Sequence, residues 1–417
     1  MDLQRRAFLK GAAVASGSAM AAAAVAVTGT VADAQAAQGA GAPGATQAAG
    51  AQPPSSVPFH GANQAGVLRP TRPQASSCFA SFALTAKNAA ELAQLLQTLT
   101  ARIRYLTAGG PPEFLGEGFP PADSEVLGPE VPADGLSVTV GLAGSVFDGR
   151  FGLAAKKPRG LTEMTVFPND VPDQAWMGGD LLLQICANSV DTVHHALRDI
   201  TRHTRAQMQP AWQITGFVSA PRPAGAPRNL FGYKDGISNP DEASGLIWIG
   251  KDSGQPEWAV GGTFIVVRLI RMLIEFWDRV SLGEQDTMIG RRRDTGAPLD
   301  GTKETDTPDY AQDSQGKVIP LTAHIRLANP RTAGTDGSRM LRRGYNYVLG
   351  ADASGQQNVG LIFACYQADI QKQFEATQQR LADEPMTDYI QAFGGQYFIG
   401  LPGVATEEGY LGQGLFG

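Results

Sequence analysis

Residues 229–240 read Asn-Leu-Phe-Gly-Tyr-Lys-Asp-Gly-Ile-Ser-Asn-Pro, and the interpretation of the whole chain depends on this segment. Its aspartate, Asp235, stands between Gly232 and Gly236, and the Ser-Asn-Pro ending is typical of a turn. Glycines let the backbone approach a flat or bulky group closely, with the carboxylate pointing inward. Taken alone, the segment fits an ordinary Asp-Gly turn better than a site, because such turns are common. More distant residues must decide between these readings.

The composition is that of a globular protein. The chain has 417 residues, of which 43% are hydrophobic and 18% are charged, with a formal net charge of −6. This length allows a substantial core and two domains or two fused half-domains. No basic surplus indicates a nucleic-acid partner. The three cysteines lie far apart in apolar runs, so we expect buried free thiols at Cys78, Cys186 and Cys365.

Residues 1–34 have the pattern of a twin-arginine export signal. Arg5 and Arg6 precede an Ala/Val-rich run, and small residues near Ala34 suit cleavage there, although Gln4 replaces the commoner Ser or Thr. A membrane-anchoring helix is the alternative, but the apolar run is too weak for a stable span. We therefore expect a periplasmic or extracellular protein. Because this export route moves folded proteins, the signal also hints at a bound cofactor.

Residues 35–57 are rich in Ala, Gly, Gln and Pro and predict a disordered linker. Two similar α+β halves then follow at 58–225 and 226–417. In the first half we expect strands at 78–84, 136–142, 180–187 and 212–218, and helices at 86–106 and 189–207. In the second half we expect strands at 262–269, 317–326, 345–348 and 360–367, and a helix at 370–382.

This repeated order predicts an α+β fold of two duplicated halves, each an antiparallel sheet with outer helices. The family resemblance described below implies that these halves are ferredoxin-like, as in dimeric α+β barrels.

The histidines and arginines narrow the candidate chemistry. Of five histidines, four border the linker or lie on a polar helix without metal-ligand spacing and are expected at the surface: His60, His194, His195 and His203. His324 instead follows an apolar run and precedes a turn, where a core histidine and a ligand are both open readings. Arg342 and Arg343 lie at the start of a predicted strand, where adjacent side chains point to opposite faces. At most one of them can therefore face a common interior, and we expect Arg343 to be solvated or ion-paired.

Three motifs in order resemble the dye-decolourising peroxidase family. They are Gly-Tyr-Lys-Asp-Gly at 232–236, His-Ile-Arg-Leu-Ala-Asn-Pro at 324–330 and Leu-Arg-Arg-Gly-Tyr at 341–345. The export signal is similar to that of the exported deferrochelatase/peroxidase branch. The resemblance covers about residues 60–417 and implies a haem enzyme. No Cys-x-x-Cys-His occurs, so the expected cofactor is haem b held without covalent attachment.

The resemblance also implies roles for individual residues. It makes His324 the axial ligand of the haem iron. Its other ring nitrogen then needs an acceptor, for which Asp369 is a candidate and a helix N-cap is the alternative role of that residue. It places Arg291 against a haem carboxylate, although the run 291–293 also fits a solvated loop. Gly232 and Gly236 would let the backbone lie against the porphyrin.

On the opposite face of the haem, the resemblance implies that Asp235 moves the peroxide proton, with Arg342 stabilising the developing negative charge. Arg342 is chosen over Arg343 because the family's arginine directly follows the apolar residue of the motif. An aspartate is a base only while ionised, and its unperturbed pKa of about 3.9 keeps it ionised in mildly acidic solution, so we expect activity to favour acidic pH. If the haem is too buried for dyes, surface aromatic residues such as Tyr345, Tyr347 or Trp277 could relay electrons, although such residues more often simply belong to the core.

The expected function is that of a haem peroxidase, which reduces hydrogen peroxide and oxidises bulky donors such as dyes or phenols one electron at a time. A second reading uses the same site for iron acquisition, through iron release from haem or oxidation of ferrous iron beside an iron transporter. A third is a non-enzymatic haem carrier. The expected partners are peroxide, an organic or ferrous donor and components of an iron-uptake system, and we expect a homo-oligomer.

Overall fold

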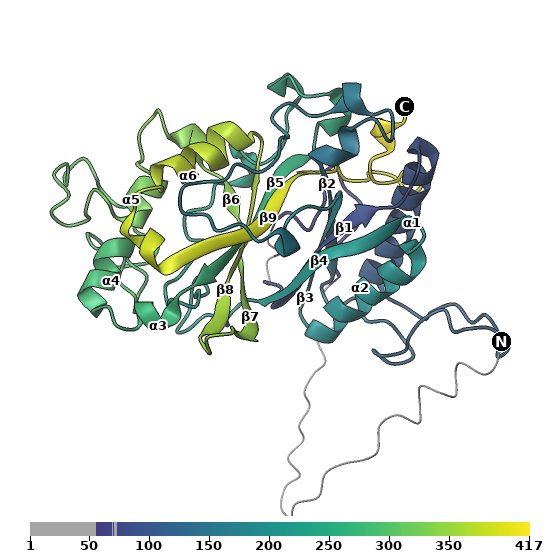
Figure 1. The fold of residues 1–417 in the computed structure, drawn as a ribbon, viewed down its shortest axis with the longest axis horizontal. Helices are drawn as coiled ribbons and strands as arrows, with labels where there is room; N and C mark the ends of the chain where they lie inside the picture. The colour runs from purple at the N-terminus through teal and green to yellow at the C-terminus, as the bar shows by residue number, and fades with distance from the viewer. Residues whose placement is uncertain (1–55, 69, 71–72) are drawn as a thin grey trace, which may run out of the picture. The chain divides into compact units, whose positions relative to one another are not determined.

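The structure is a computed structural model that describes residues 56–68, 70 and 73–417. The expected export signal at 1–34 and the expected linker up to residue 55 lie outside the described residues. Helices flank a central set of strands, with α1 and α2 on one side and α3, α4, α5 and α6 on the other (Figure 1).

The first half follows a βαββαβ order. Its elements are β1 (Ser76–Leu84), α1 (Ala89–Ala108), β2 (Ser137–Ala143), β3 (Leu181–Ala187), α2 (Val190–Thr204) and β4 (Met208–Phe217). The helix α1 begins where the Asn88 side chain accepts a hydrogen bond from the Glu91 backbone N–H at 3.0 Å. It ends at Gly109, whose φ of 72° only glycine adopts readily. Local capping chemistry therefore sets both ends of this helix.

The second half repeats the order with a long insertion after its first strand. Its strands are β5 (Thr263–Met272), β7 (Tyr345–Ala351), β8 (Gln357–Gln367) and β9 (Ile390–Gly400), and the short β6 (Leu341–Arg342) precedes β7. Its helices are α3 (Ile274–Trp277), α4 (Leu282–Ile289), α5 (His324–Ala328), a π-helical turn at Ile370–Glu375 and α6 (Ala376–Arg380).

The strands form one closed antiparallel barrel. The first half contributes the order β2-β3-β1-β4 and the second half β9-β5-β8-β7, which is the same arrangement, that of a ferredoxin-like unit. The two halves join where β2 pairs with β9 and where β4 pairs with β7. Since β8 also pairs with β5, no edge of this ring is left open. The expected duplicated ferredoxin-like fold is confirmed.

Two faces of the sheet carry two cores. The barrel interior is filled by aromatic and branched side chains, among them Phe79, Trp212, Ile265, Tyr366 and Phe398. The outer face of the first half packs against α1 and α2. The apolar residues of α1 recur at helical spacing and are fully buried: Leu92, Leu95, Leu96, Leu99 and Ile103. The three cysteines are free and buried, as predicted.

One predicted strand is wrong. Residues 317–323 form a loop and residues 324–326 are the start of α5, so no strand lies here. The carboxylate of Asp313 accepts hydrogen bonds from the backbone N–H groups of Lys317, Val318 and Ile319, at 2.7 to 3.3 Å. These donors cannot pair with a neighbouring strand, so the apolar run turns instead of extending. The strand β9 and the helix α4 were not predicted.

One predicted surface histidine is also misplaced. His195 is 1% exposed, and its Nε2 lies 2.7 Å from a carboxylate oxygen of Asp123, which is buried as well. His60, His194 and His203 are exposed, as expected. His195 is buried although it is polar, because it lies on the inward face of α2 and the loop that carries Asp123 covers it.

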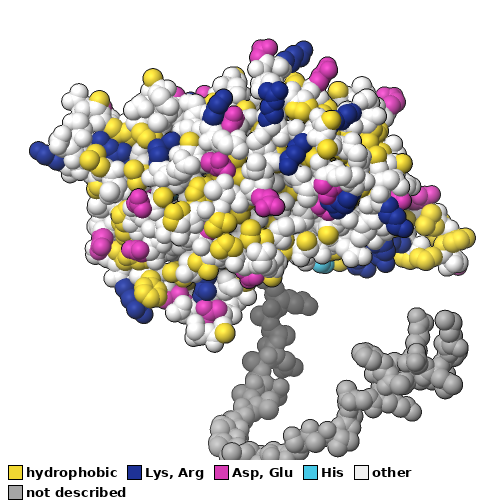
Figure 2. Space-filling view, turned by 45° about the horizontal axis from the view of Figure 1, so that its top comes forward, with side chains coloured by type: hydrophobic (Ala, Val, Ile, Leu, Met, Phe, Trp, Pro, Cys, Tyr) yellow, Lys and Arg dark blue, Asp and Glu magenta, His cyan; other side chains and the backbone are white. Residues whose placement is uncertain are grey.

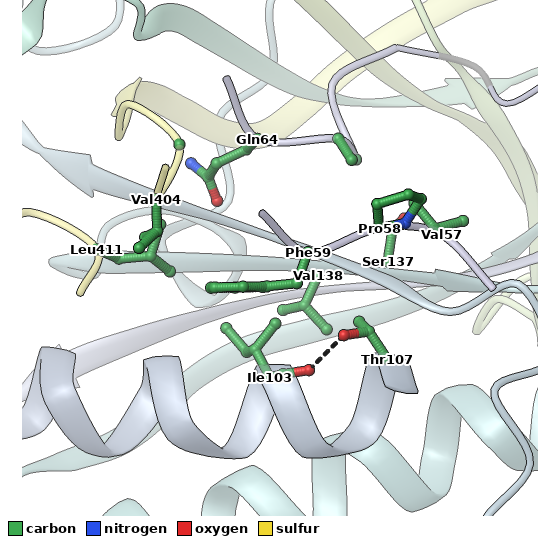
Figure 3. A pocket seen from close by; sticks show the side chains of 13 residues that line it. Val57, Pro58, Phe59, Gln64, Ile103, Thr107, Ser137, Val138, Val404 and Leu411 are labelled. Atoms are coloured by element: carbon green, nitrogen blue, oxygen red, sulfur yellow. Dashed lines mark hydrogen bonds between the residues drawn. The ribbon is translucent and has the colours of Figure 1, made fainter. Parts of the chain in front are cut away.

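Charged side chains of both signs are mixed on one face of the molecule (Figure 2), and a hollow lies beside α1. Lysine and arginine side chains are interspersed with aspartate and glutamate over the face shown in Figure 2. No helix in the described part of the chain is long and apolar enough to span a membrane. A hollow of about 310 Å³ lies between α1 and the segment around Val404 (Figure 3). Its Gln64 is bonded to the backbone of Val140 and Leu401, so it fastens the fold.

Candidate active site

The predicted residues come together beside the second half of the barrel. Asp235 lies in the segment between the halves, His324 begins α5, and Arg342 ends β6. An Nη2 of Arg342 lies 3.4 Å from Oδ1 of Asp235. The pKa of His324 responds to the charges of both, so the three side chains share one electrostatic environment. Sequence positions up to 107 residues apart therefore meet at one place.

The loop of Asp235 is held in place by an asparagine that the sequence did not single out. The Asn239 side chain accepts a hydrogen bond from the Arg342 backbone N–H at 3.0 Å and donates one to the Arg342 carbonyl at 2.9 Å. This pair of bonds mimics a strand partner for β6. It explains why Asp235, four residues earlier, lies next to the Arg342 guanidinium.

Glycines on both sides of Asp235 have the backbone conformation that the segment requires. Gly232 has a φ of 87° and Gly236 a φ of 89°, a region that other residues rarely adopt. A Cβ on Gly232 would also meet the Arg293 side chain at 3.2 Å. The turn at 229–233 is tightened by the Asn229 carboxamide oxygen, which accepts from two backbone N–H groups at 3.1 Å. The segment is thus a rigid turn that presents an acid.

His324 has one ring nitrogen fixed and the other available. Its Nδ1 lies 2.7 Å from Oε2 of Glu384, a carboxylate whose side chain is only 3% exposed. Among the described residues, Nε2 has no hydrogen-bond partner, and 39% of the His324 side chain is exposed. The surrounding protein alone would lower the pKa of His324, but the charge and hydrogen bond of Glu384 outweigh it and raise that pKa.

The candidate acceptor for His324 was therefore wrong. Asp369 caps the π-helical turn by accepting from the Lys372 backbone N–H at 3.0 Å, which is the alternative that the sequence left open. Glu384 lies 60 residues from His324 in an acidic stretch before a proline, and no local pattern marks it as a partner. Only the approach of the segment after α6 to α5 brings the two together.

The two adjacent arginines face opposite sides of the sheet, as strand geometry requires. Arg342 is half-exposed beside Asp235. Arg343 is not solvated as expected, because it is 1% exposed inside the barrel and donates to the carbonyls of Gly66 and Leu68 and to the Gln74 side chain. The choice of Arg342 as the residue beside Asp235 agrees with this geometry.

Arg291 is buried and is not part of a solvated loop. It is 5% exposed, and its Nη1 donates to the carbonyls of Gly296 at 2.7 Å and Glu304 at 2.9 Å. Burial lowers the pKa of Arg291, and the positive charges of Arg331 and Arg342 act in the same direction. A buried arginine near two other cations favours the approach of an anionic group.

These features fit a haem. A half-exposed histidine whose Nε2 has no hydrogen-bond partner among the described residues can serve as an iron ligand once that nitrogen carries no proton. None of the five residues of α5 is fully buried. On β8, Leu361 and Phe363 are half-exposed on the face that also carries Cys365, the pairing partner of Arg342. Apolar surface, a free imidazole nitrogen and clustered arginines together match a flat ring with an iron and carboxylates.

Comparisons with known proteins identify the family of this chain. The profile described as Dyp-type peroxidase, N-terminal, matches residues 64–218, and that described as Dyp-type peroxidase, C-terminal, matches residues 226–405. A protein named deferrochelatase from Yersinia pestis bv. Antiqua (strain Nepal516) is 47% identical over 367 residues, which cover 86% of this chain and 84% of the relative. A deferrochelatase from Escherichia coli O6:K15:H31 is 48% identical over 368 residues, 86% of each chain.

Solved structures show the same relation. A DyP-type peroxidase from Cellulomonas bogoriensis superposes with a TM-score of 0.78 at 34% identity, over 87% of this chain and 98% of that chain. Ferric DtpA from Streptomyces lividans gives the same values. With both halves of the barrel matched and the site residues brought together, the chain belongs to the Dyp-type peroxidase family.

Proposed function

We propose that this haem peroxidase reduces hydrogen peroxide with Asp235 as the proton-transfer residue and Arg342 as the fixed positive charge. The observation that carries the proposal is the contact of Asp235 with Arg342, in the electrostatic environment of a histidine whose Nε2 is free. Haem b, bound without a covalent link, would be held by His324 at the iron. Arg291 would lie at a haem carboxylate, with Gly232 and Gly236 in the turn beside the ring.

The bound haem supplies the redox chemistry, and the chain's own residues manage protons and charge. Asp235 takes the proton from the inner oxygen of peroxide and returns it to the outer oxygen. Arg342 cannot lose its proton and stabilises the negative charge that develops on the departing oxygen. In the tautomer with its proton on Nδ1, His324 would donate that proton to Glu384, and the lone pair on Nε2 would then be available to the iron.

An Asp235→Asn variant tests the acid–base role. The rate constant of the haem absorption change after peroxide is mixed in should fall by about 10²–10⁴-fold, because the amide cannot accept the proton. Asp369→Asn is the matched control, since Asp369 is a helix cap and should leave this rate unchanged. Activity should favour acidic pH in the wild type, and this dependence should flatten in the variant. A wild-type rate in Asp235→Asn would remove Asp235 from the mechanism.

A second candidate function is iron acquisition, because relatives that are 47% and 48% identical carry the name deferrochelatase. In this reading, the protein releases iron from haem and leaves the porphyrin intact, and it acts with an iron-uptake system after twin-arginine export to the periplasm or outside the cell. Incubating the haem-loaded protein under reducing conditions should then yield metal-free porphyrin fluorescence and chelatable ferrous iron in equal amounts. Peroxide turnover without either product would leave the peroxidase as the sole function.

Three further expectations belong to the same proposal. We propose that the boundary near residue 225 separates two halves that arose as a duplicated unit, with the haem site attached to the second. We also propose that the assembled protein is a homo-oligomer, which sedimentation of the haem-loaded chain would measure. The electron donor is expected to be an organic molecule or ferrous iron.

A further inference from the structure

The loop that carries Asp235 is fastened to the rest of the molecule by an ion pair. The Nζ of Lys234, the residue before Asp235, donates to a carboxylate oxygen of Glu304 and to the Ala224 carbonyl, the latter at 2.6 Å. The Lys234 side chain is 4% exposed and that of Glu304 is 19% exposed. A cation that is enclosed to this degree needs an opposite charge beside it. The lysine therefore holds its loop against the segment that carries Glu304.

The backbone directs Lys234 and Asp235 to opposite sides of the loop. Lys234 forms a β-bridge with Arg228, which indicates an extended chain at this point. Adjacent side chains of an extended chain point in opposite directions. Lys234 accordingly contacts Glu304, whereas Asp235 contacts Arg342. Fixing the lysine in this short segment therefore also fixes the direction of the acid.

Glu304 holds two parts of the proposed site at once. Its carboxylate accepts from Lys234 and from the Ala226 backbone N–H, the latter at 3.0 Å, and its carbonyl accepts from Nη1 of Arg291 at 2.9 Å. Burial alone would raise the pKa of Glu304, but the hydrogen bonds from Lys234 and Ala226 outweigh it and lower that pKa. One charged residue thus links the loop of Asp235 to the arginine proposed for a haem carboxylate.

A glycine makes room for this link. Gly296 has a φ of 78°, and a Cβ at this position would lie 2.7 Å from Cδ of Lys234. The Gly296 carbonyl also accepts a hydrogen bond from Nη1 of Arg291 at 2.7 Å. The lysine stem and the arginine therefore contact the same turn. A shift of this turn would move both of them together.

We propose that Lys234 and Glu304 are positioning residues, which hold Asp235 beside Arg342 and couple the placement of Asp235 to the binding of a haem carboxylate by Arg291. The proposal rests on the proposed function of the last three residues. Lys234 and Glu304 do not touch the reacting oxygens in this role. Loss of their ion pair loosens the loop and also releases the turn that holds Arg291. Both effects follow from one contact, so each variant should show them together.

Lys234→Met and Glu304→Gln break the pair by different routes. Methionine keeps much of the lysine stem without its charge, and glutamine keeps the shape of Glu304 and its acceptor for Ala226. In the haem-loaded protein, the rate constant of the haem absorption change with peroxide should fall by about 10–100-fold in each variant, because a displaced acid transfers the proton poorly. Asp199→Asn is the matched control. It breaks the ion pair of Arg102 and Asp199 between α1 and α2 and should leave this rate unchanged.

Hydrogen exchange measures the position of the loop without any turnover. The backbone amides of residues 226–238, followed by mass spectrometry in the haem-free protein, should exchange about tenfold faster or more in Lys234→Met and Glu304→Gln, because the loop opens more often. In Asp199→Asn the exchange of this segment should equal that of the wild type.

Haem and its dimethyl ester separate the effect on Arg291 from a general loss of structure. The dissociation constant of haem should rise by about fivefold or more in Lys234→Met and Glu304→Gln. That of the ester should change little, because the ester has no free carboxylate for Arg291 to bind. An equal loss of affinity for both ligands would mean that the pair supports the fold in general, and would overturn the coupling to Arg291.

A double variant shows whether the two residues act as a pair. Lys234→Met combined with Glu304→Gln should react with peroxide no more slowly than the slower single variant, because their contact can be lost only once. Rate losses that multiply would overturn the pair. Wild-type exchange together with wild-type haem affinity in both single variants would overturn the whole proposal. Asp235→Asn tests the proposed function separately, because neither amide exchange nor the preference for haem over its ester depends on proton transfer.

Discussion

In the first half of the barrel, the 20-residue helix α1 covers the outer face of the sheet with fully buried leucines. In the second half, the corresponding region holds the five-residue helix α5, none of whose residues is buried. Both halves have the same strand order, so the sheet does not explain the difference. The second half therefore has an inserted segment of short helices and loops where the first half has a packing helix, and our proposal places the haem beside that segment.

The largest expected effect distinguishes His324 in the second half from His195 in the first, since each lies next to a buried carboxylate and only His324 is proposed to hold haem. His324→Ala should abolish the haem absorption band on haem titration, because it removes the proposed iron ligand. His195→Asn, which changes the buried pair of His195 and Asp123 in the first half, should lower the melting temperature and leave the haem band intact. An unaltered haem band in His324→Ala would break the assignment of the site to the second half.

A cavity made beneath α1 should lower the stability of the protein and leave peroxide turnover unchanged. Leu96→Ala removes a fully buried side chain and should lower the free energy of unfolding by about 2–5 kcal/mol. Denaturant unfolding measures this loss, and peroxide turnover per folded molecule should equal that of the wild type. Leu327→Ala makes the same change on α5. Because Leu327 is only half-buried, we expect it to lower the free energy of unfolding by less. Equal losses in both variants would contradict the contrast in packing.

Glu384→Gln tests the carboxylate that orients His324. The variant keeps a hydrogen-bond acceptor but removes the negative charge, and haem affinity or peroxide turnover should fall by about 10–100-fold. The iron reduction potential should also rise, since a less basic imidazole stabilises the oxidised iron less. Potentiometry of the haem-loaded variant measures this shift. A wild-type potential would limit Glu384 to a structural role.

The smallest effect concerns Asp180, an acid that the first half uses for structure. Its carboxylate accepts from Leu84 N, Ser145 Oγ and Arg150 at 2.6 to 3.2 Å. Burial alone would raise the pKa of Asp180, but these hydrogen bonds outweigh it and lower that pKa. Its contribution to stability is therefore complete above the unfolded pKa of about 3.9 and is lost as pH falls through the lower folded value.

Asp180→Asn should accordingly destabilise the protein by about 1–2 kcal/mol at pH 7. The difference from the wild type should shrink as pH falls below about 4. Thermal unfolding of both proteins across this pH range provides the measurement. A difference that stays constant with pH would mean that the charge of Asp180 contributes nothing to stability.

The sequence by itself determined the elements whose signals are local. The leucine spacing of α1 and the strands of the first half were legible because side-chain periodicity reports which face is buried. Asp235, His324 and Arg342 were identified through three motifs in a fixed order. The alternation of side chains along a strand was also enough to show that Arg342 and Arg343 face opposite ways.

Only the tertiary structure decided the contacts between segments far apart in the chain. Glu384 replaced Asp369 as the partner of His324, and Asn239 emerged as the residue that fixes Asp235 beside β6. The predicted strand at 317–326 became a loop followed by the start of α5, because Asp313 accepts the backbone N–H groups of residues 317–319. The physical reason is common to all of these cases: a hydrogen bond depends on which groups meet in space, and neither periodicity nor composition records that meeting.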